Sequence, residues 1–422
     1  MQRPDLLKAL PAIIQNDIAV IHKTLRVNGF ECYLVGGCVR DLLLGRSVKD
    51  LDFTTNAEPS SVQSIFKRTV PTGIKHGTIT VLLEDRSYEV TTYRAESDYS
   101  DARRPDRITF AKTLSEDLSR RDFTINALAL DPDTGSITDE HGGLDDLEKR
   151  ILRTIGKPEE RFFEDGLRTV RACRFASVLG FTIEPGTLAA LSLPEIQKRT
   201  ALVAIERFTD ELWKGFSGKT VSGLIQHLEG TGLLDLFVRF PGTKPETTKT
   251  TPEILSKLDQ IRSAENRMGI WLSHFFPLQS AERSIEPVCK KLKFSGSQMQ
   301  YCQTLTRVLA FALTAQPTPN IADQRRFCAR LKKELASPIQ WLEEIEEIER
   351  VEPIASMILQ FKEILTNDPL LPTDLKIDGN DLKSLGFEGR LIGQKIDQLL
   401  THVYKDPGVN TREKLIELLQ AN

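Results

Sequence analysis

The feature that most constrains this chain is a short apolar run, CYLV (32–35), that ends in two glycines, Gly36 and Gly37. The run is suited to a buried strand, and the following CVRDLLLG is typical of a helix that ends at Gly45. Backbone N–H groups at such a turn can bind phosphate oxygens, and Arg40 adds a guanidinium on the first helical turn. Taken alone, a double glycine before a helix is more often only a tight turn. Its neighbourhood in the sequence decides between the two interpretations.

Two aspartates follow the turn, Asp50 and Asp52, in an alternating stretch, DLDFTT (50–55), that predicts a strand. Side chains two residues apart on a strand point the same way, so these carboxylates can share a pair of hard cations, with Mg²⁺ the expected cofactor. Two such ions about 4 Å apart activate an attacking hydroxyl group and stabilise a leaving pyrophosphate. Glu89, on the second strand of a hairpin predicted over 77–94, is a third candidate carboxylate, although a lone strand glutamate is as often simply exposed.

The remaining patterns predict an α/β part followed by a helical part. The strand-like stretches and a helix at 61–67 indicate a small α/β domain at the start of the chain. From about residue 150 onward helical periodicity dominates, and we expect no strand there. The length of 422 residues exceeds one ordinary domain, so two to four domains are expected.

Composition and spacing exclude several classes of protein. The six cysteines lie far apart without a Cys-x-x-Cys motif, and the six histidines have no metal-ligand spacing, so neither a zinc site nor a disulfide framework is expected. The first residues carry charges throughout their apolar periodicity, which is typical of an amphipathic helix and not of a signal peptide or membrane span. A soluble, cytoplasmic protein is the expectation. With a formal charge of −3, any RNA binding must rest on local basic patches.

The stretch VGGCVRDLLLGRSVKDLDF (35–53) resembles the signature of the polymerase-beta-like nucleotidyltransferase superfamily, in its branch of class II tRNA nucleotidyltransferases (CCA-adding enzymes) and bacterial poly(A) polymerases. Further stretches resemble that family's later motifs, in its order and at its spacing: RRDFTINAL (120–128), GGLDDL (142–147), EDGLRTVRACRFA (164–176) and ERFTDEL (206–212). The resemblance covers roughly residues 30–215. It implies an α/β catalytic head with a small mixed sheet, followed by an all-α neck, body and tail.

Boundaries and roles follow from this resemblance. We expect a nucleotidyltransferase head at 1–148, a helical neck with the base-selecting motif at 149–240, a helical body at 241–366 and a tRNA-binding helical tail at 367–422. Asp50 and Asp52 would hold the metal ions, and Glu89 would join them as a catalytic carboxylate. The nucleotide-binding residues implied are Gly36, Gly37, Arg40, Arg121, Asp122, Asn126, Asp165, Arg168, Arg171 and Arg174.

Selection of the base can be argued from hydrogen-bonding groups. On their pairing edges, cytosine and adenine both offer an amino donor beside a ring-nitrogen acceptor. Asp165 can accept from the amino group while Arg168, expected three residues on along the same helix, donates to the ring nitrogen. Uracil and guanine reverse this pattern and leave polar groups unpaired. On a helix, Arg174 would lie about half a circumference from Asp165, since there are about 3.6 residues per turn, which favours phosphate or structural pairing for it.

The expected reaction is template-independent addition of C, C and A to the 3′ end of tRNA from CTP and ATP, without DNA or a membrane as partner. In the family, a flexible element at the position of DARRPD (101–106) is associated with addition of the terminal A, and CC-adding members lack it. An A-adding enzyme and a poly(A) polymerase remain alternatives, and a non-catalytic RNA-binding protein is the alternative from another class. Glu206 and Arg207 are expected to brace the base-reading helices. Basic clusters at 290–293 and 325–333 are candidate contacts to RNA phosphates.

Overall fold

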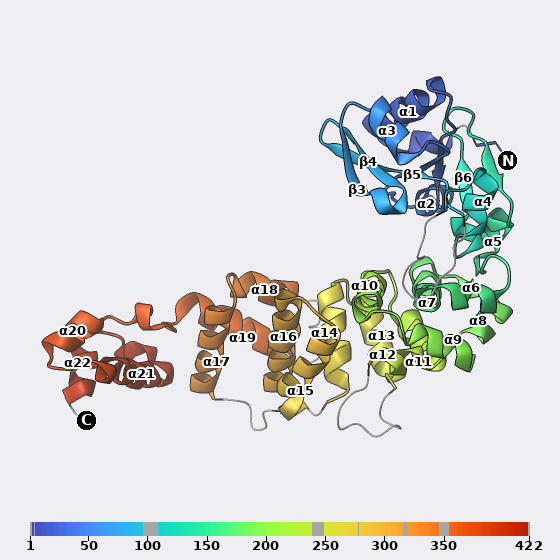
Figure 1. Ribbon diagram of the computed structural model, residues 1–422. Helices are drawn as coiled ribbons and strands as arrows, with labels where there is room; N and C mark the ends of the chain where they lie inside the picture. The colour runs from blue at the N-terminus through green and yellow to red at the C-terminus, as the bar shows by residue number, and fades with distance from the viewer. Residues whose placement is uncertain are drawn as a thin grey trace. The chain divides into compact units, whose positions relative to one another are not determined.

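A computed structural model describes residues 2–3, 5–95, 109–238, 249–276, 278–314, 320–345 and 354–420. They fall into two compact units, Met1–Arg239 and Phe240–Asn422 (Figure 1). The predicted limits at 148 and 366 lie inside these units and stay predictions.

The first unit is built on a seven-stranded mixed sheet, as the sequence predicted. Its spatial order is β3-β4-β5-β2-β1-β6-β7, and within the described part of this sheet only the pairing of β2 with β5 is parallel. The predicted hairpin over 77–94 is confirmed as β4 and β5. The strands are β1 (Tyr33–Val35), β2 (Asp52–Thr55), β3 (Thr69–Gly73), β4 (Thr78–Leu83), β5 (Arg86–Thr92), β6 (Leu128–Leu130) and β7 (Ile137–Asp139).

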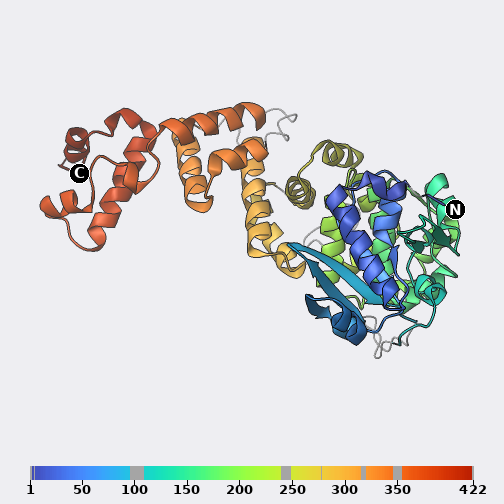
Figure 2. The same cartoon turned by 90° about the horizontal axis from the view of Figure 1, so that it is seen from above.

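Helices pack on this sheet through their apolar faces. Ile18, Ile21 and Leu25 recur at helical spacing on the first of them and are fully buried, as is Phe53 in the sheet. In Figures 1 and 2 the first and third helices lie side by side over the strands. The helices of this part are α1 (Ala12–Val27), α2 (Gly37–Leu43), α3 (Pro59–Ile65), α4 (Leu114–Ser119) and α5 (Gly143–Lys149), with short 3-10 helices at Leu6–Ala9, Ile74–His76 and Thr124–Asn126.

Strand β2 is shorter than the sequence predicted. It begins at Asp52, and Asp50 lies outside it, exposed in an irregular stretch. The reason is that the neighbouring strand β1 is short. It has three residues, and it pairs with β2 at Tyr33 with Thr54 and at Leu34 with Phe53, so it offers no partner for Asp50. The placement of both aspartates on one strand is therefore wrong.

The rest of the first unit is helical apart from one small sheet. Strands β8 (Ile151–Leu152) and β9 (Thr182–Ile183) pair in parallel, so the expectation of no strand beyond residue 150 is wrong. Two residues are too few to form a recognisable alternation. The helices are α6 (Pro158–Glu164), α7 (Leu167–Leu179), α8 (Pro185–Ala190), α9 (Pro194–Thr200), α10 (Ile205–Phe216), α11 (Ser222–Gly230) and α12 (Leu233–Phe237).

The described residues of the second unit form helices joined by turns and no strand, as predicted. Leu305, Trp341, Phe361 and Leu400 belong to one shared apolar core. The helices are α13 (Pro252–Gln260), α14 (Ala264–His274), α15 (Leu278–Lys291), α16 (Gly296–Thr314), α17 (Ile321–Glu334), α18 (Pro338–Glu344), α19 (Ile354–Asn367), α20 (Gly379–Ser384), α21 (Arg390–Lys405) and α22 (Arg412–Gln420), with 3-10 helices at Pro372–Asp374 and Pro407–Val409.

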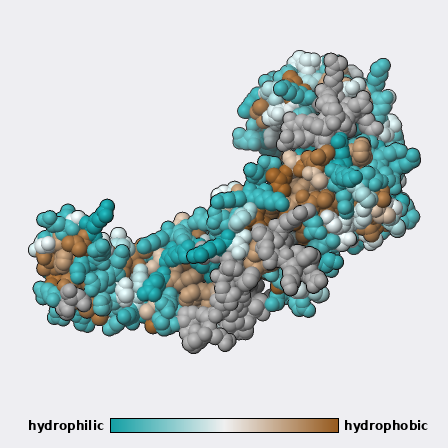
Figure 3. Space-filling view, turned by 60° about the horizontal axis from the view of Figure 1, so that its bottom comes forward, coloured by the Kyte–Doolittle hydropathy of each residue, from teal (hydrophilic) through white to brown (hydrophobic). Residues whose placement is uncertain are grey.

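The polarity of the surface and the state of the cysteines both bear on expectations drawn from the composition. Hydrophilic side chains cover much of the face seen in Figure 3. No helix among the described residues is long and apolar enough to cross a membrane. All six cysteines of the sequence are free thiols in this structure, and all are buried.

Candidate active site

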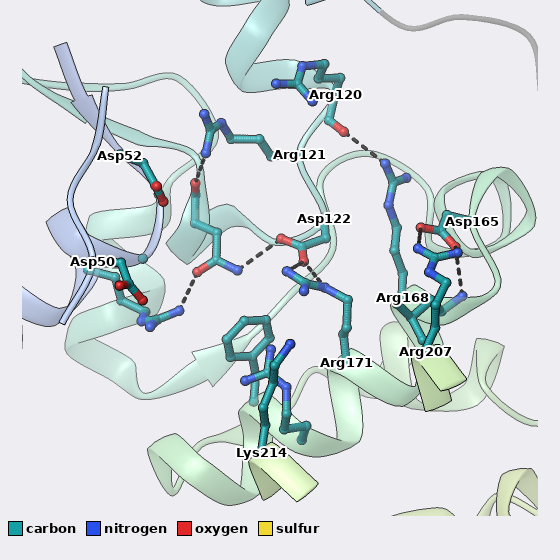
Figure 4. Close-up of a pocket in the computed structure, with 17 residues that line it drawn as sticks. Asp50, Asp52, Arg120, Arg121, Asp122, Asp165, Arg168, Arg171, Arg207 and Lys214 are labelled. Atoms are coloured by element: carbon teal, nitrogen blue, oxygen red, sulfur yellow. Dashed lines mark hydrogen bonds and ion pairs between the residues drawn. The ribbon is translucent and has the colours of Figure 1, made fainter. Parts of the chain in front are cut away.

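A polar pocket with a volume of about 640 Å³ lies in the first unit (Figure 4). Eight of its lining side chains are cationic and four are acidic, although the whole chain carries a formal charge of −3. The surplus of positive charge suits a polyanionic ligand such as a nucleoside triphosphate. Its lining residues are Gly36, Gly37, Arg40, Asp50, Asp52, Arg120, Arg121, Asp122, Asn126, Asp165, Leu167, Arg168, Arg171, Arg174, Phe175, Arg207 and Lys214.

The glycine turn and Arg40 line this pocket, although the N–H group of Gly36 itself donates to the carbonyl oxygen of Leu128 at 3.2 Å. Gly36 has φ +75°, a conformation that side chains other than glycine rarely adopt, and a Cβ atom there would lie 2.8 Å from Nη1 of Arg121. Arg40 on α2 is held by neighbours, because Nη1 donates to Oδ1 of Asn126 at 2.7 Å and Nη2 pairs with Asp41 at 2.9 Å. The turn therefore admits the close approach of Arg121.

Two of the three candidate carboxylates line the pocket. Asp50 and Asp52 do so, whereas Glu89, the register partner of Asp52 on β5, is exposed and is not among the lining residues. Burial, followed by the negative charge of Glu89, raises the pKa of Asp52, and Arg121 opposes this shift. A cation would relieve the repulsion between these carboxylates.

The donor set fits Mg²⁺ bound together with a substrate. Within the described ranges, no cluster of three or more His, Cys, Asp or Glu residues could hold a metal ion. Mg²⁺ commonly binds through one or two carboxylates and completes its shell with water and substrate phosphate oxygens. Asp50 and Asp52 meet the protein's share of that requirement.

Asp122 and Asn126 form a rigid floor between the turn and helix α7. Oδ1 of Asp122 accepts from Nδ2 of Asn126 at 3.0 Å, and Oδ2 accepts from Nη2 of Arg171 at 2.6 Å. Although burial works in the opposite direction, Arg171 and the bond from Asn126 lower the pKa of Asp122 to about 2. The carboxylate is thus ionised at neutral pH.

The predicted base-selecting pair does not lie on one helix. Helix α6 ends at Glu164 and α7 begins at Leu167, so Asp165 sits in an extended conformation between them, with φ −134° and ψ 105°. Gly166 allows the break, because a Cβ atom there would lie 2.8 Å from the backbone of α9. The expectation of a shared helix is wrong, yet both side chains line the pocket.

Different partners hold the two side chains (Figure 4). Asp165 accepts from Arg207, with Nη2 of the arginine 3.0 Å from Oδ2. Arg168 donates from Nη1 to Glu164 and from Nη2 to the carbonyl oxygen of Arg120, at 3.0 Å in the latter case. The carboxylate and the guanidinium are therefore positioned independently of one another.

Helix α7 also brings Arg171 and Arg174 to the pocket, around the ring of Phe175. The guanidinium carbon of Arg174 lies 3.9 Å from the ring centroid, and those of Arg171 and Arg40 lie at 5.1 Å. Arg174 is further paired with Glu211 on α10. Phe175 is thus a shared platform for three arginines.

Five lining residues were not among the predicted site residues: Arg120, Leu167, Phe175, Arg207 and Lys214. Arg207 and Lys214 lie on α10 with the buried Glu211 between them. Their spacing of four and three residues places all three on one face of a helix, which is a signal the sequence contains.

Other predicted features lie elsewhere. DARRPD (101–106) falls outside the described residues. In the basic cluster at 325–333 several charges are engaged within the unit, since Arg325 pairs with Asp368 at 2.5 Å and Arg330 with Glu334 at 2.8 Å. Lys290 of the other cluster pairs with Glu286 at 2.6 Å. Both clusters stay predictions as RNA contacts.

Comparison with known proteins identifies the family. The model of the "Poly A polymerase head domain" matches residues 32–153, and that of the "Probable RNA and SrmB-binding site of polymerase A" matches 180–247. The CCA-adding enzyme of Enterococcus faecalis is 36% identical over 404 residues, which cover 95% of this chain and 94% of that enzyme. The chain belongs to the family of CCA-adding enzymes.

Other members of the CCA-adding enzyme family match at different lengths. The Oceanobacillus iheyensis enzyme is 48% identical over 235 residues, which span 56% of this chain and 58% of that enzyme. The solved structure of the Bacillus stearothermophilus CCA-adding enzyme in complex with CTP has a TM-score of 0.71 at 27% identity and covers 98% of this chain and 99% of its own. The Thermotoga maritima CCA-adding enzyme complexed with tRNA, at 19% identity and a TM-score of 0.65, shares the fold.

Proposed function

We propose that this chain adds C, C and A to the 3′ end of tRNA, using CTP and ATP and two Mg²⁺ ions. The observation that carries the proposal is the pocket, in which the glycine turn, Asp50 and Asp52, and Asp165 with Arg168 line one cavity. Family membership over nearly the whole chain supports it, because relatives of matching length are CCA-adding enzymes.

Each group has a task in this reaction. The 3′ hydroxyl of the RNA attacks the α-phosphorus of the nucleotide, and pyrophosphate leaves. Asp50 and Asp52 would hold Mg²⁺, whose charge would activate the hydroxyl group and stabilise the leaving pyrophosphate. The turn at Gly36 and Gly37, with Arg121 and Arg40, lines the pocket and would face the triphosphate.

Base choice falls to Asp165 and Arg168. Arg168 has five N–H groups, and its hydrogen bonds to Arg161, Glu164 and Arg120 use three of them. Donors therefore remain for the ring nitrogen of cytosine or adenine, while Asp165 accepts from the amino group. The reversed pattern of uracil and guanine would leave Asp165 facing a carbonyl group, which excludes them.

Extension of three tRNA transcripts tests the function. The transcripts end before CCA, after CC and after CCA, and each is incubated with Mg²⁺ and with CTP and ATP singly or together. We expect the first to gain C, C and one A and then to stop. Extension of only the CC-ended transcript would indicate an A-adding enzyme, and long A tails on any RNA would indicate a poly(A) polymerase.

Replacement of one metal-binding carboxylate tests the mechanism. Asp52→Ala should lower incorporation by a factor on the order of 10³ or more, because charge stabilisation at the reacting phosphate is lost. Asp85→Ala, in the exposed turn between β4 and β5, is the control and should leave the rate unchanged. RNA binding by Asp52→Ala should persist. Unchanged incorporation by Asp52→Ala would contradict the metal assignment. If the unsubstituted protein also fails to incorporate nucleotides, an RNA-binding role would be favoured.

A further inference from the structure

One acidic side chain beside the pocket has no role in the reaction as described so far. Asp117, on α4, is fully buried, with 0% of its surface exposed. Oδ1 accepts from Nε and Nη2 of Arg120 at 2.9 and 2.6 Å, and Oδ2 accepts from Nη2 of Arg121 at 3.1 Å. A single buried carboxylate thus serves two neighbouring arginines that both line the pocket.

Two further donors tie Asp117 to the strands. The hydroxyl group of Thr54 on β2 lies 3.3 Å from Oδ2 and 3.3 Å from the carbonyl oxygen of Thr91, which share its one proton, and the backbone N–H of Arg94 lies 3.1 Å from Oδ1. Thr54 is two residues from Asp52 and therefore shares its face of the sheet. Asp117 is accordingly fixed relative to the strand that carries Asp52.

The arginines pass this fixed position on to the ligand-binding groups. Nη1 of Arg121 lies 3.4 Å from the carbonyl oxygen of Asn126 and approaches Gly36 at the phosphate-binding turn. The carbonyl oxygen of Arg120 accepts from Nη2 of Arg168, the proposed base-reading residue, at 3.0 Å. One carboxylate is therefore linked both to the triphosphate side of the pocket and to its base-reading side.

The charge of Asp117 is needed for this arrangement. Burial alone would raise its pKa, but Arg120 and Arg121 lower the pKa to about 2, so the group is ionised at neutral pH. A neutral residue of the same shape would leave two partly buried guanidinium groups without their counter-charge, which is costly and loosens both side chains. The ionised carboxylate thus holds both arginines through charge-assisted hydrogen bonds.

We propose that Asp117 is a positioning residue that aims Arg121 at the triphosphate and, through the Arg120 backbone, supports base reading by Arg168. This inference rests on the proposed function of the pocket. It differs from a structural role in a measurable way, because loss of Asp117 must act on nucleotide binding through Arg121.

The test compares Asp117→Asn with Asp17→Asn. Asp17 is a matched control, since it is also buried in this unit, pairs with Arg86 at 2.5 Å and is not among the pocket residues. We measure the dissociation constant for CTP by calorimetry, the ratio of CTP to UTP incorporation, and the thermal midpoint. Asp117→Asn should weaken CTP binding by about tenfold and lower the incorporation ratio, as expected for a lost charge-assisted bond. Asp17→Asn should lower only the midpoint.

A double-mutant cycle separates positioning from general damage. In an Arg121→Ala background, Asp117→Asn should weaken CTP binding by less than about twofold, because the group through which it acts is already absent. Equal CTP binding by Asp117→Asn and Asp17→Asn, or an undiminished loss in the Arg121→Ala background, would overturn the inference.

A milder variant covers the case in which Asp117→Asn does not fold. Thr54→Val removes the hydroxyl group that Oδ2 shares with the carbonyl oxygen of Thr91, and it should weaken CTP binding about threefold; unchanged binding would count against the inference. The proposed function fails separately, if the unsubstituted protein binds CTP but does not extend tRNA.

Discussion

The guanidinium group of Arg207 donates two hydrogen bonds to the carboxylate of Asp165, with Nη2 3.0 Å from Oδ2 and Nη1 3.4 Å from Oδ1. Arg207 is on α10, whereas Asp165 lies in the break between α6 and α7. The carboxylate proposed to read the base is therefore oriented by a residue 42 positions away.

This pairing predicts the effect of Arg207→Lys. An ammonium group cannot make both bonds of the planar fork, so Asp165 gains freedom while the charge is kept. We expect the preference for CTP over UTP to fall about tenfold, as for one charge-assisted bond. Arg153→Lys, which alters a pair with Asp146 away from the pocket, should keep the preference. Selectivity equal in both variants would show that Arg207 does not orient the reading group.

A second prediction concerns the glycine turn. Gly36→Ala should abolish most nucleotide binding, since its Cβ atom would displace Arg121 from 2.8 Å. Gly29→Ala is matched to it, because Gly29 has φ +83° and no atom within 4 Å of the added Cβ. Both variants should lose about 1 kcal/mol of stability from the strained backbone. Titration with CTP should separate them, and similar affinities would argue against a phosphate site at this turn.

Phe175→Leu tests the platform beneath the three arginines. The change keeps the site apolar but removes the ring face, which contributes about 0.5–2 kcal/mol per well-placed cation. The KM for nucleotide should rise several-fold with little change in the KM for tRNA. Phe216 is a fully buried phenylalanine on α10 that does not line the pocket. Phe216→Leu should therefore lower the thermal midpoint and leave both KM values unchanged. A rise in the tRNA KM alone would assign the arginines to RNA instead.

Asp122 predicts a pH dependence of stability. Its pKa of about 2 in the folded protein lies below the ordinary value of 3.8, so the stabilisation from the ionised form is complete above about pH 4 and is lost as pH falls toward 2. Asp122→Asn lacks this stabilisation at every pH. Urea unfolding at pH 6 and pH 3 should therefore show a smaller loss on acidification in the variant than in the unsubstituted protein. Equal losses would contradict the lowered pKa.

Much of the α/β part could be predicted because its signals are local. The run at 32–35, the helix that starts at Gly37 and the hairpin around Glu84 and Asp85 each depend on neighbouring residues. Strands β6 and β8 could not be found in this way. Their three and two residues are strands only because distant segments pair with them.

The site followed the same rule. The turn residues and Asp52, whose chemistry is visible in the sequence, do line the pocket, and their roles stay predictions. The break before Leu167 was missed because its cause, the close approach of α9 to Gly166, is a tertiary contact. Asp117 was missed for a related reason, since an aspartate in the first turn of a helix is common and only its partners on other elements distinguish it.

The six buried cysteines have a practical consequence. Burial raises the pKa of the Cys173 thiol to about 12 and that of Cys38 to about 11, so these groups are neither accessible nor ionised under ordinary conditions. A cysteine introduced at an exposed position, such as that of Val27, would then be the single target for a maleimide fluorophore. The chain can therefore carry a site-specific optical probe without first being stripped of its own thiols.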